Sequence, residues 1–228
     1  MNDFKLLVFD WDGTLMDSEA RIVACLRAAI ADLDLEARDG SLLRDVIGLG
    51  LREAFARLYP EAENDALERM KERYRHHFLH IDETPSPLFP GISELLRQLE
   101  RSGVFLGVAT GKGRIGLNKA LSQSNLDGLF HATRCADETA SKPNPQMLFE
   151  VMDAVGVYPD QTLMIGDTEY DMLMAGNAGT AALAVSYGVH ARERLLAHAP
   201  LACLDSVEEL QQWLYSGRIE STESRYVS

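Results

Sequence analysis

The segment that decides the fold is FKLLVFDWDGT, residues 4–14. Its mostly apolar residues 4–9 predict a buried strand. Asp10 and Asp12 follow where Gly13 ends the strand pattern, so two carboxylates stand at the carboxyl end of a strand. Ligand sites of parallel sheets form at that end. The segment therefore predicts a functional site as well as a strand.

The residues after this segment have a helical pattern. Apolar residues recur at helical spacing from residue 17 to residue 33, and the pattern continues toward residue 80. The sequence TPSP at 84–87 is stiff and turn-rich, as is typical of a domain boundary. We therefore predict an inserted all-helical cap domain over residues 16–83. Its later helices are expected over residues 41–47, 51–59 and 64–80.

Beyond residue 90, predicted strands and helices alternate. Strands are expected at 104–109, 130–135, 162–165 and 181–185, and helices at 91–102, 114–124, 144–155 and 171–177. This rhythm favours an α/β fold, a doubly wound parallel sheet with a Rossmann-like core built from residues 1–15 and 84–216. A last helix is expected over 207–214. Residues 217–228 are polar and without periodicity, which predicts a flexible tail.

Composition narrows the function. The chain has 228 residues, 46% of them hydrophobic and 25% charged, as is typical of folded globular proteins. Its net charge of -13 argues against nonspecific binding to nucleic acid or to an anionic membrane, since both require a basic surface. An anionic substrate would therefore need local positive charge, from a metal ion or a few basic side chains.

Three widely spaced cysteines predict neither a disulfide framework nor a zinc site. No apolar segment approaches the roughly 20 residues of a membrane helix, and the N-terminus does not resemble a signal peptide. A cytoplasmic location is expected. The sequence leaves monomer and homodimer open.

Three later segments also place polar groups beside predicted strands or helices. VATG ends with Thr110 and Gly111, whose hydroxyl and amide suit a phosphate oxygen. Lys142 precedes a helix, and GDTEYD contains Asp167 and Asp171 after another strand. Each segment alone has a simpler interpretation, as a turn, a helix cap or a surface lysine. Together they predict one site.

Converging carboxylates require a cation, because like charges repel one another. Mg²⁺ prefers hard oxygen ligands and binds through one or two carboxylates plus a substrate phosphate. Asp10 and Asp167 suit that role, and Mg²⁺ is the expected cofactor.

In their order, DWDGT at 10–14, Thr110, Lys142-Pro143 and GDTEYD at 166–171 resemble the four motifs of the haloacid dehalogenase superfamily. The resemblance spans nearly the whole chain, and its helical insertion is similar to that superfamily's small helical cap. LMDS at 15–18 and AGNAG at 175–179 favour the phosphoglycolate-phosphatase-like branch.

The resemblance implies a role for each matching residue. Asp10 would be the nucleophile and a metal ligand, and Asp12 the general acid and base, with its carbonyl on the metal. A second Asp in this motif favours a phosphatase over a dehalogenase, because an alkoxide leaving group needs a proton. The remaining roles are phosphate binding by Thr110, Gly111 and Lys142, metal binding by Asp167, and support by Asp171, Gly13 and Thr14.

The resulting hypothesis is a Mg²⁺-dependent phosphatase that hydrolyses a small phosphorylated metabolite through an aspartyl phosphate. One alternative is a sugar phosphomutase similar to beta-phosphoglucomutase, which would return the phosphoryl group to a sugar. Another is a receiver-like signalling module with a long-lived phospho-aspartate and no turnover. Free phosphate, an isomerised sugar phosphate and a stable phosphoprotein distinguish the three.

Other residues receive simpler interpretations. Lys112 and Arg114 are assigned to a solvated face and left out of the core site. His76 and His80 are four residues apart on a helix but have no third ligand, so a solvated helix face is favoured over a metal site. The loop at 48–51 is expected to reach the site from the cap and to influence specificity.

Overall fold

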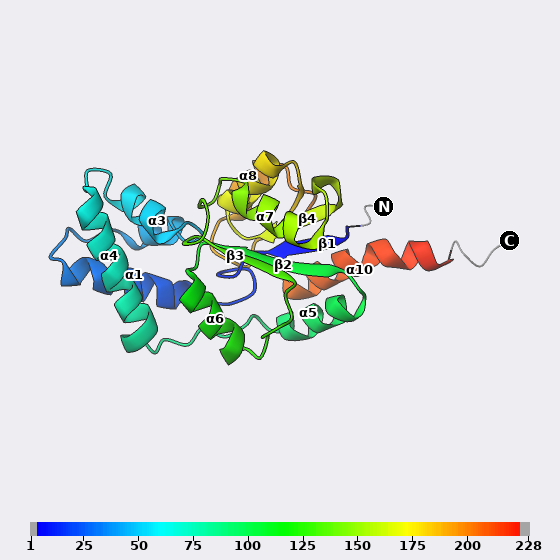
Figure 1. Cartoon of the computed structure of the whole chain (residues 1–228), viewed down its shortest axis with the longest axis horizontal. Coiled ribbons are helices and arrows are strands. Elements are labelled where there is room, and N and C mark those ends of the chain that lie inside the picture. The colour runs from blue at the N-terminus through cyan, green and yellow to red at the C-terminus, as the bar shows by residue number, and fades with distance from the viewer. Residues whose placement is uncertain (1–3, 224–228) are drawn as a thin grey trace.

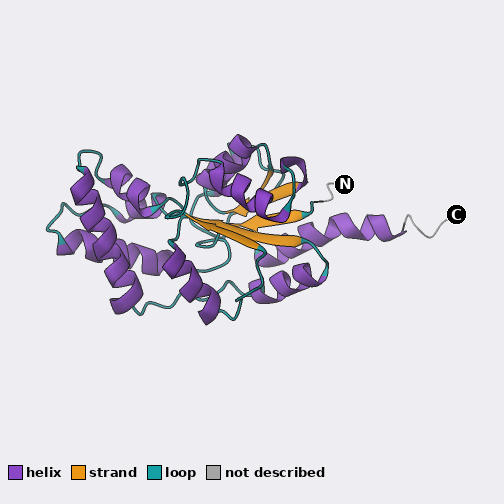
Figure 2. Ribbon diagram, viewed as in Figure 1, coloured by secondary structure: helices purple, strands orange, loops and turns teal. Residues whose placement is uncertain are grey.

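The structure is a computed structural model that describes residues 4–223, with side chains described through residue 216. Its centre is a parallel sheet, drawn in orange in Figure 2. The sheet has six strands in the order β3-β2-β1-β4-β5-β6. The strands are β1 (Leu6–Phe9), β2 (Phe105–Thr110), β3 (Ala132–Cys135), β4 (Thr162–Gly166), β5 (Ala181–Val185) and β6 (Cys203–Leu204). The strand order places β1 at the centre, which explains why its four residues are all buried.

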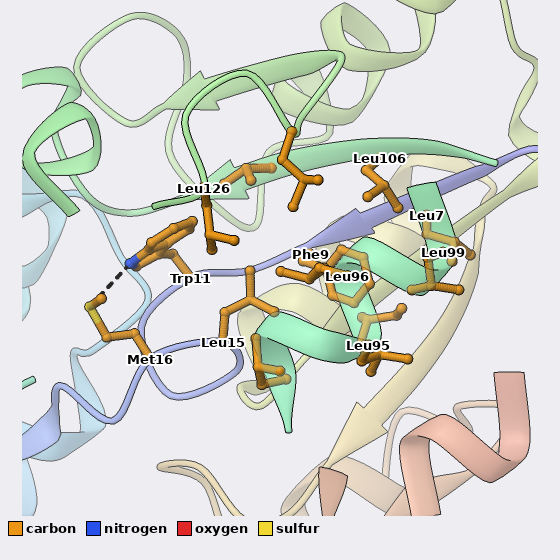
Figure 3. Close-up of a cluster of buried hydrophobic side chains, with 14 of the residues drawn as sticks. Leu7, Phe9, Trp11, Leu15, Met16, Leu95, Leu96, Leu99, Leu106 and Leu126 are labelled. Carbon is orange, nitrogen blue, oxygen red and sulfur yellow. Dashed lines mark hydrogen bonds between the residues drawn. The ribbon is translucent and has the colours of Figure 1, made fainter. Parts of the chain in front are cut away.

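Alternation along β1 divides the core into two layers. Leu7 and Phe9 belong to one hydrophobic cluster, and Leu6 and Val8 belong to another. The first cluster (Figure 3) includes residues of α5 (Ile92–Arg101), α6 (Arg114–Gln123) and α10 (Val207–Glu223). The second includes residues of α7 (Gln146–Val155) and α8 (Glu169–Ala178). Helices therefore cover both faces, and the predicted doubly wound fold is confirmed.

The helices between β1 and α5 have a hydrophobic cluster of their own. They are α1 (Glu19–Asp32), α2 (Gly40–Asp45), α3 (Leu51–Leu58) and α4 (Asn64–His76), followed by a π-helical turn (His77–Ile81). In Figure 1 they form a separate group at the opposite end of the molecule from both chain ends. We infer that this group is the cap domain.

The chain passes between the core and the cap twice, and the two crossings are paired. Met16 and Leu88 form an antiparallel bridge. The Asp17 N–H donates to the Pro87 carbonyl at 2.8 Å, and the Phe89 N–H donates to the Leu15 carbonyl at 3.0 Å. The connection is therefore a short two-stranded ribbon.

The sequence analysis missed several short or aperiodic elements. It did not predict the 3₁₀ turn Pro159–Gln161, α9 (Arg192–Leu196) or the two-residue β6, because such short segments carry no measurable periodicity. The last helix was expected to end at residue 214, but α10 continues to Glu223, through the first part of the predicted tail. Residues 224–228 of that tail lie outside the described residues.

None of the helices within residues 4–223 is long and apolar enough to cross a membrane.

Candidate active site

The predicted site residues come from the carboxyl ends of neighbouring strands. Asp10 follows β1, Thr110 ends β2, and Asp167 follows β4. Lys142 lies in the loop between β3 and α7. The Asp10 N–H donates to the Ile165 carbonyl at 2.9 Å, which extends the pairing of β1 with β4 up to the site. The parallel sheet thus brings together residues that are up to 157 positions apart, from Asp10 to Asp167.

Three carboxylates and one lysine form the buried centre of the site. Oxygen atoms of Asp10, Asp167 and Asp171 lie within 4.8 Å of one another. Lys142 Nζ lies 2.7 Å from Asp10 Oδ1 and 2.6 Å from Asp171 Oδ1. The Lys142 side chain is fully buried, so Lys142 is not a solvated surface charge. Its position between Asp10 and Asp171 is consistent with the predicted site lysine.

Burial and charge shift the protonation of this centre. Burial raises the pKa of Asp10 well above its ordinary value, Lys142 opposes that shift, and the neighbouring carboxylates add to it. Burial lowers the pKa of Lys142, but Asp10 and Asp171 more than offset this and leave its pKa above the ordinary value. The charged form of Lys142 is therefore favoured, whereas burial favours the protonated form of Asp10.

Asp167 is held by two donors from different loops. Thr14 Oγ1 donates to Oδ1 at 2.7 Å, and the Val189 N–H donates to Oδ2 at 2.9 Å. Burial, followed by the charge of Asp171, still raises the pKa of Asp167 to about 7. Gly13 makes the close approach possible: its φ is +88°, and a Cβ there would lie 2.2 Å from Asp167 Oδ2.

Asp171 joins the lysine to a helix. Its Oδ2 accepts hydrogen bonds from the Thr168 N–H at 3.0 Å and from Thr168 Oγ1 at 2.7 Å, while Oδ1 faces Lys142. Thr168 is the N-cap of α8, and the pair forms a capping box. The residue predicted to support the site therefore also fixes the start of α8.

The donor set of this centre fits a hard divalent cation. Asp10 Oδ2 is buried and has no hydrogen-bond partner among the described residues, although a buried polar atom is normally satisfied. Oδ1 of Asp171 is paired with the Lys142 cation at 2.6 Å, whereas both oxygens of Asp167 accept only from uncharged donors, the Thr14 hydroxyl and the Val189 N–H. Asp10 and Asp167 are thus the carboxylates best suited to bind Mg²⁺, which takes carboxylate oxygens.

Asp12 has different neighbours from Asp10. Ser18 Oγ donates to Asp12 Oδ1 at 2.6 Å, and Lys112 Nζ lies 2.9 Å from the same oxygen. Asp12 also lines a cavity between the core and the cap, together with Gly111 and Lys112. Asp12 is therefore open to the cavity, whereas Asp10 is enclosed among Lys142 and the other carboxylates.

The assignment of Lys112 to a solvated face was wrong. The residue is only 9% exposed, and its Nζ lies between Asp12 and the Phe78 ring, whose centroid is 4.5 Å away. Phe78 belongs to the π-helical turn at the end of the cap, so this contact depends on tertiary packing that no local pattern reveals. Arg114, in contrast, pairs with Glu138 at 2.7 Å, and within the described residues it makes no hydrogen bond or ion pair with Asp10, Asp12 or Lys142.

The cap loop reaches the site as predicted. A Cβ on Gly111 would lie 2.5 Å from the carbonyl oxygens of both Gly48 and Leu49, so the loop packs directly against the backbone after β2. The Gly50 N–H also donates to Ser141 Oγ at 2.8 Å, next to Lys142. The cap is therefore closed over the site.

The two histidines that the sequence analysis considered lie outside the predicted centre. His76 and His80 are both exposed, and within residues 4–223 they belong to no group of three potential metal ligands.

The sequence analysis missed the loop after β5, where Val189 contacts Asp167. The strand at 181–185 was predicted, so its carboxyl end was the available signal for this contact.

Comparisons with known proteins agree with this geometry. Residues 7–185 match the family model of haloacid dehalogenase-like hydrolases. The chain is 34% identical over 209 residues to "Probable phosphatase IndB" of Dickeya dadantii, covering 90% of this chain and 91% of the relative. It is 30% identical over 224 residues to the phosphoglycolate phosphatase of Rhodospirillum rubrum, covering 92% and 90% of the two chains.

A solved structure shows the same architecture. The crystal structure of a predicted phosphatase from Clostridium acetobutylicum has a TM-score of 0.85 and 26% sequence identity, covering 93% of this chain and 99% of that one. The comparisons confirm the predicted enzyme class and the resemblance to the phosphoglycolate-phosphatase-like branch. They also favour an enzyme over a receiver-like module. The chain belongs to the haloacid dehalogenase-like hydrolases.

Proposed function

We propose that the protein is a Mg²⁺-dependent phosphatase that hydrolyses a small phosphate monoester through an aspartyl phosphate on Asp10. The observation that carries this proposal is the unpartnered Asp10 Oδ2, which is buried beside Lys142 and close to Asp167. The phosphatases among the similar proteins support the same reaction.

Asp10 supplies the nucleophile. One of its oxygens attacks phosphorus, a P–O bond to Asp10 forms, and the bond to the leaving oxygen breaks. Lys142, 2.7 Å from Asp10, offsets the negative charge of the transferred group. The Thr110 hydroxyl and the Gly111 N–H, at the end of β2, are the proposed donors to the other phosphoryl oxygens.

Asp12 acts first as the general acid and then as the general base. It gives a proton to the departing alkoxide, so the leaving group departs as a neutral alcohol. The resulting carboxylate then removes a proton from a water molecule that hydrolyses the aspartyl phosphate. Asp12 faces the cavity, as both steps require, and Ser18 fixes its carboxylate by a 2.6 Å hydrogen bond.

Asp10, Asp167 and the Asp12 carbonyl are the proposed ligands of Mg²⁺, and Asp171 and Thr14 position the lysine and Asp167. The bound ion would offset charge on the phosphoryl oxygens and lower the pKa values of the carboxylates that bind it. The cap, packed on Gly111, would exclude bulk water between the two half-reactions.

Replacement of Asp10 tests the proposal. Asp10→Asn should lower the kcat of Mg²⁺-dependent phosphate release by on the order of 10³-fold or more, because the amide is a poor nucleophile. Asp160→Asn, an equivalent change at an exposed core-domain position, is the control. Mass spectrometry after acid quenching should find the phosphoryl group on the peptide that contains Asp10.

Substantial activity of purified Asp10→Asn would reject the nucleophile. A mutase would instead convert a hexose 1-phosphate into its isomer with little free phosphate, so product analysis on the same sample separates the two reactions.

A further inference from the structure

The cavity beside Asp12 is lined mainly by apolar side chains. Its volume is about 220 Å³. A single water needs only about 10–15 Å³ on a comparable measure, so the cavity has room for a leaving group of several non-hydrogen atoms. Most of its wall is apolar and comes from the cap, including Ile22, Leu26, Ile47, Leu49, Ala54 and Leu79.

The charged groups that line the cavity already have partners. Lys112 lies 2.9 Å from Asp12 and over the Phe78 ring. Arg75 and Asp137 are partly exposed and lie 4.0 Å from each other. A carboxylate on the leaving group would therefore lose its water and meet a mainly apolar wall, which is unfavourable without a cation of its own.

Tyr74 supplies the uncharged polar group of this cavity. Its side chain is 8% exposed and stacks on Phe78 with ring centroids 5.7 Å apart. Its hydroxyl makes no hydrogen bond to a described residue, so it is available to a ligand in the cavity that Tyr74 lines. Burial and then the charge of Asp12 raise the pKa of Tyr74, so the hydroxyl keeps its proton and remains a donor near Asp12.

We propose that this cavity binds an uncharged, largely apolar leaving group with one hydrogen-bonding atom that meets the Tyr74 hydroxyl. This inference rests on the proposed phosphatase function and names its substrate class. The inferred substrate differs from phosphoglycolate, in which the carboxylate carbon is only two bonds from the ester oxygen. That carboxylate would lie directly beside Asp12.

Three alkyl phosphates test the assignment on the full chain with Mg²⁺. They are benzyl phosphate, its meta-hydroxymethyl derivative and phosphoglycolate. Benzyl phosphate should have a kcat/KM about 10-fold or more above that of phosphoglycolate, as expected when an apolar pocket selects among small substrates. An equal or higher kcat/KM for phosphoglycolate would overturn the inference.

Tyr74→Phe provides the sharper measurement. It should lower kcat/KM by about 10-fold for the meta-hydroxymethyl ester and leave that of benzyl phosphate within about 2-fold, because only the first ester loses a hydrogen bond. Tyr158→Phe, at a 73% exposed position, is the matched control. An equal loss for both esters would show a merely structural role and overturn the assignment of Tyr74.

A second variant does not depend on Tyr74. Leu51→Arg adds a cation to the cavity lining and should shift the ratio of kcat/KM values toward phosphoglycolate by about 10-fold. Leu42→Arg adds the same charge to the cap at a 50% exposed position outside the lining and should leave the ratio unchanged. An unchanged ratio in Leu51→Arg would count against the cavity as the leaving-group site.

Failure of the proposed function gives a different result. In that case the wild-type protein would release no phosphate from any of the three esters and would match Asp10→Asn. Phosphate release that depends on Asp10 but prefers phosphoglycolate would reject only the substrate class.

Discussion

At the scale of single residues, Asp171 shows how one carboxylate serves both folding and chemistry. One oxygen holds Lys142 and the other caps α8 through Thr168. A change of the Asp171 carboxylate itself affects both tasks, since an amide in its place would face one of these partners with its own N–H group.

This double role leads to a prediction for Asp171→Asn. The variant should lower kcat/KM by about 100-fold, because Lys142 loses a fixed partner, and lower the free energy of unfolding by about 1–3 kcal/mol. Thr168→Val removes only the hydroxyl and should cost about 1 kcal/mol of stability with little change in kcat/KM. Denaturant titrations and steady-state kinetics on both variants measure the difference. Similar losses of activity in the two would refute the division of roles.

The residue scale also shows what sequence reasoning can reach. The segments that contain Asp10, Asp12, Lys142 and Asp167 each had a simpler interpretation alone, as a turn, a helix cap or a surface lysine. These residues were singled out because their segments occur together, in the order of the four motifs that they resemble. Lys112 has no such pattern, and its burial depends on Phe78, 34 positions earlier in the cap. A contact between two domains cannot be derived from either segment alone.

At the scale of elements, the contact between cap and core includes polar bonds from α8 and α9 to α2. The Tyr170 hydroxyl of α8 donates to the Asp45 carbonyl of α2 at 2.7 Å. Arg194 of α9 pairs with the Asp45 carboxylate and also with Glu169. Because α9 was not predicted, this link between cap and core could not be predicted either.

Removal of one of these bonds should affect closure rather than folding. Tyr170→Phe should lower kcat/KM by about 2- to 10-fold, the equivalent of one neutral hydrogen bond, while Tm changes little. Tyr59→Phe is the counterpart, because the Tyr59 hydroxyl donates to the Glu36 carbonyl within the cap. That variant should lower Tm and leave kcat/KM nearly unchanged. The reverse pattern would mean that the Tyr170 bond contributes to stability and not to closure.

At the scale of the whole molecule, the buried carboxylates link stability to pH and metal. The pKa of Asp167 is about 7 in the folded protein, against an ordinary value of 3.8. Between these values the native state keeps a proton that the unfolded chain has lost, so this group makes the free energy of unfolding fall as pH rises. Mg²⁺ binds the ionised carboxylate and should counteract the loss.

Thermal unfolding tests this linkage. In the presence of a chelator, Tm should fall more steeply between pH 4 and pH 7 in the wild-type protein than in Asp167→Asn. Added Mg²⁺ should raise the wild-type Tm more at pH 8 than at pH 5 and leave Asp167→Asn almost unchanged. The quantity to compare is the slope of Tm against pH, and not Tm itself. The amide nitrogen introduced by Asp167→Asn cannot accept from the Val189 N–H, so the substitution lowers Tm at every pH. Equal slopes would show that Asp167 is not the titrating group.

The net charge of the chain and its oligomeric state also belong to this scale. The chain has a net charge of -13, so an anionic substrate needs positive charge at the site itself. Lys142, beside Asp10, and Lys112, beside Asp12, supply such local positive charge. The sequence leaves monomer and homodimer open, and sedimentation analysis of the purified chain distinguishes the two.

The paired crossings between core and cap restrict how the enzyme can open. The ribbon has two hydrogen bonds, from Asp17 to Pro87 and from Phe89 to Leu15, and a swivelling motion would break both. Bending across the ribbon preserves them, so we expect the cap to open by a hinge motion about this ribbon. A hinge of this kind would return the same loop, residues 48–51, to Gly111 at each closure and so reproduce the shape of the cavity.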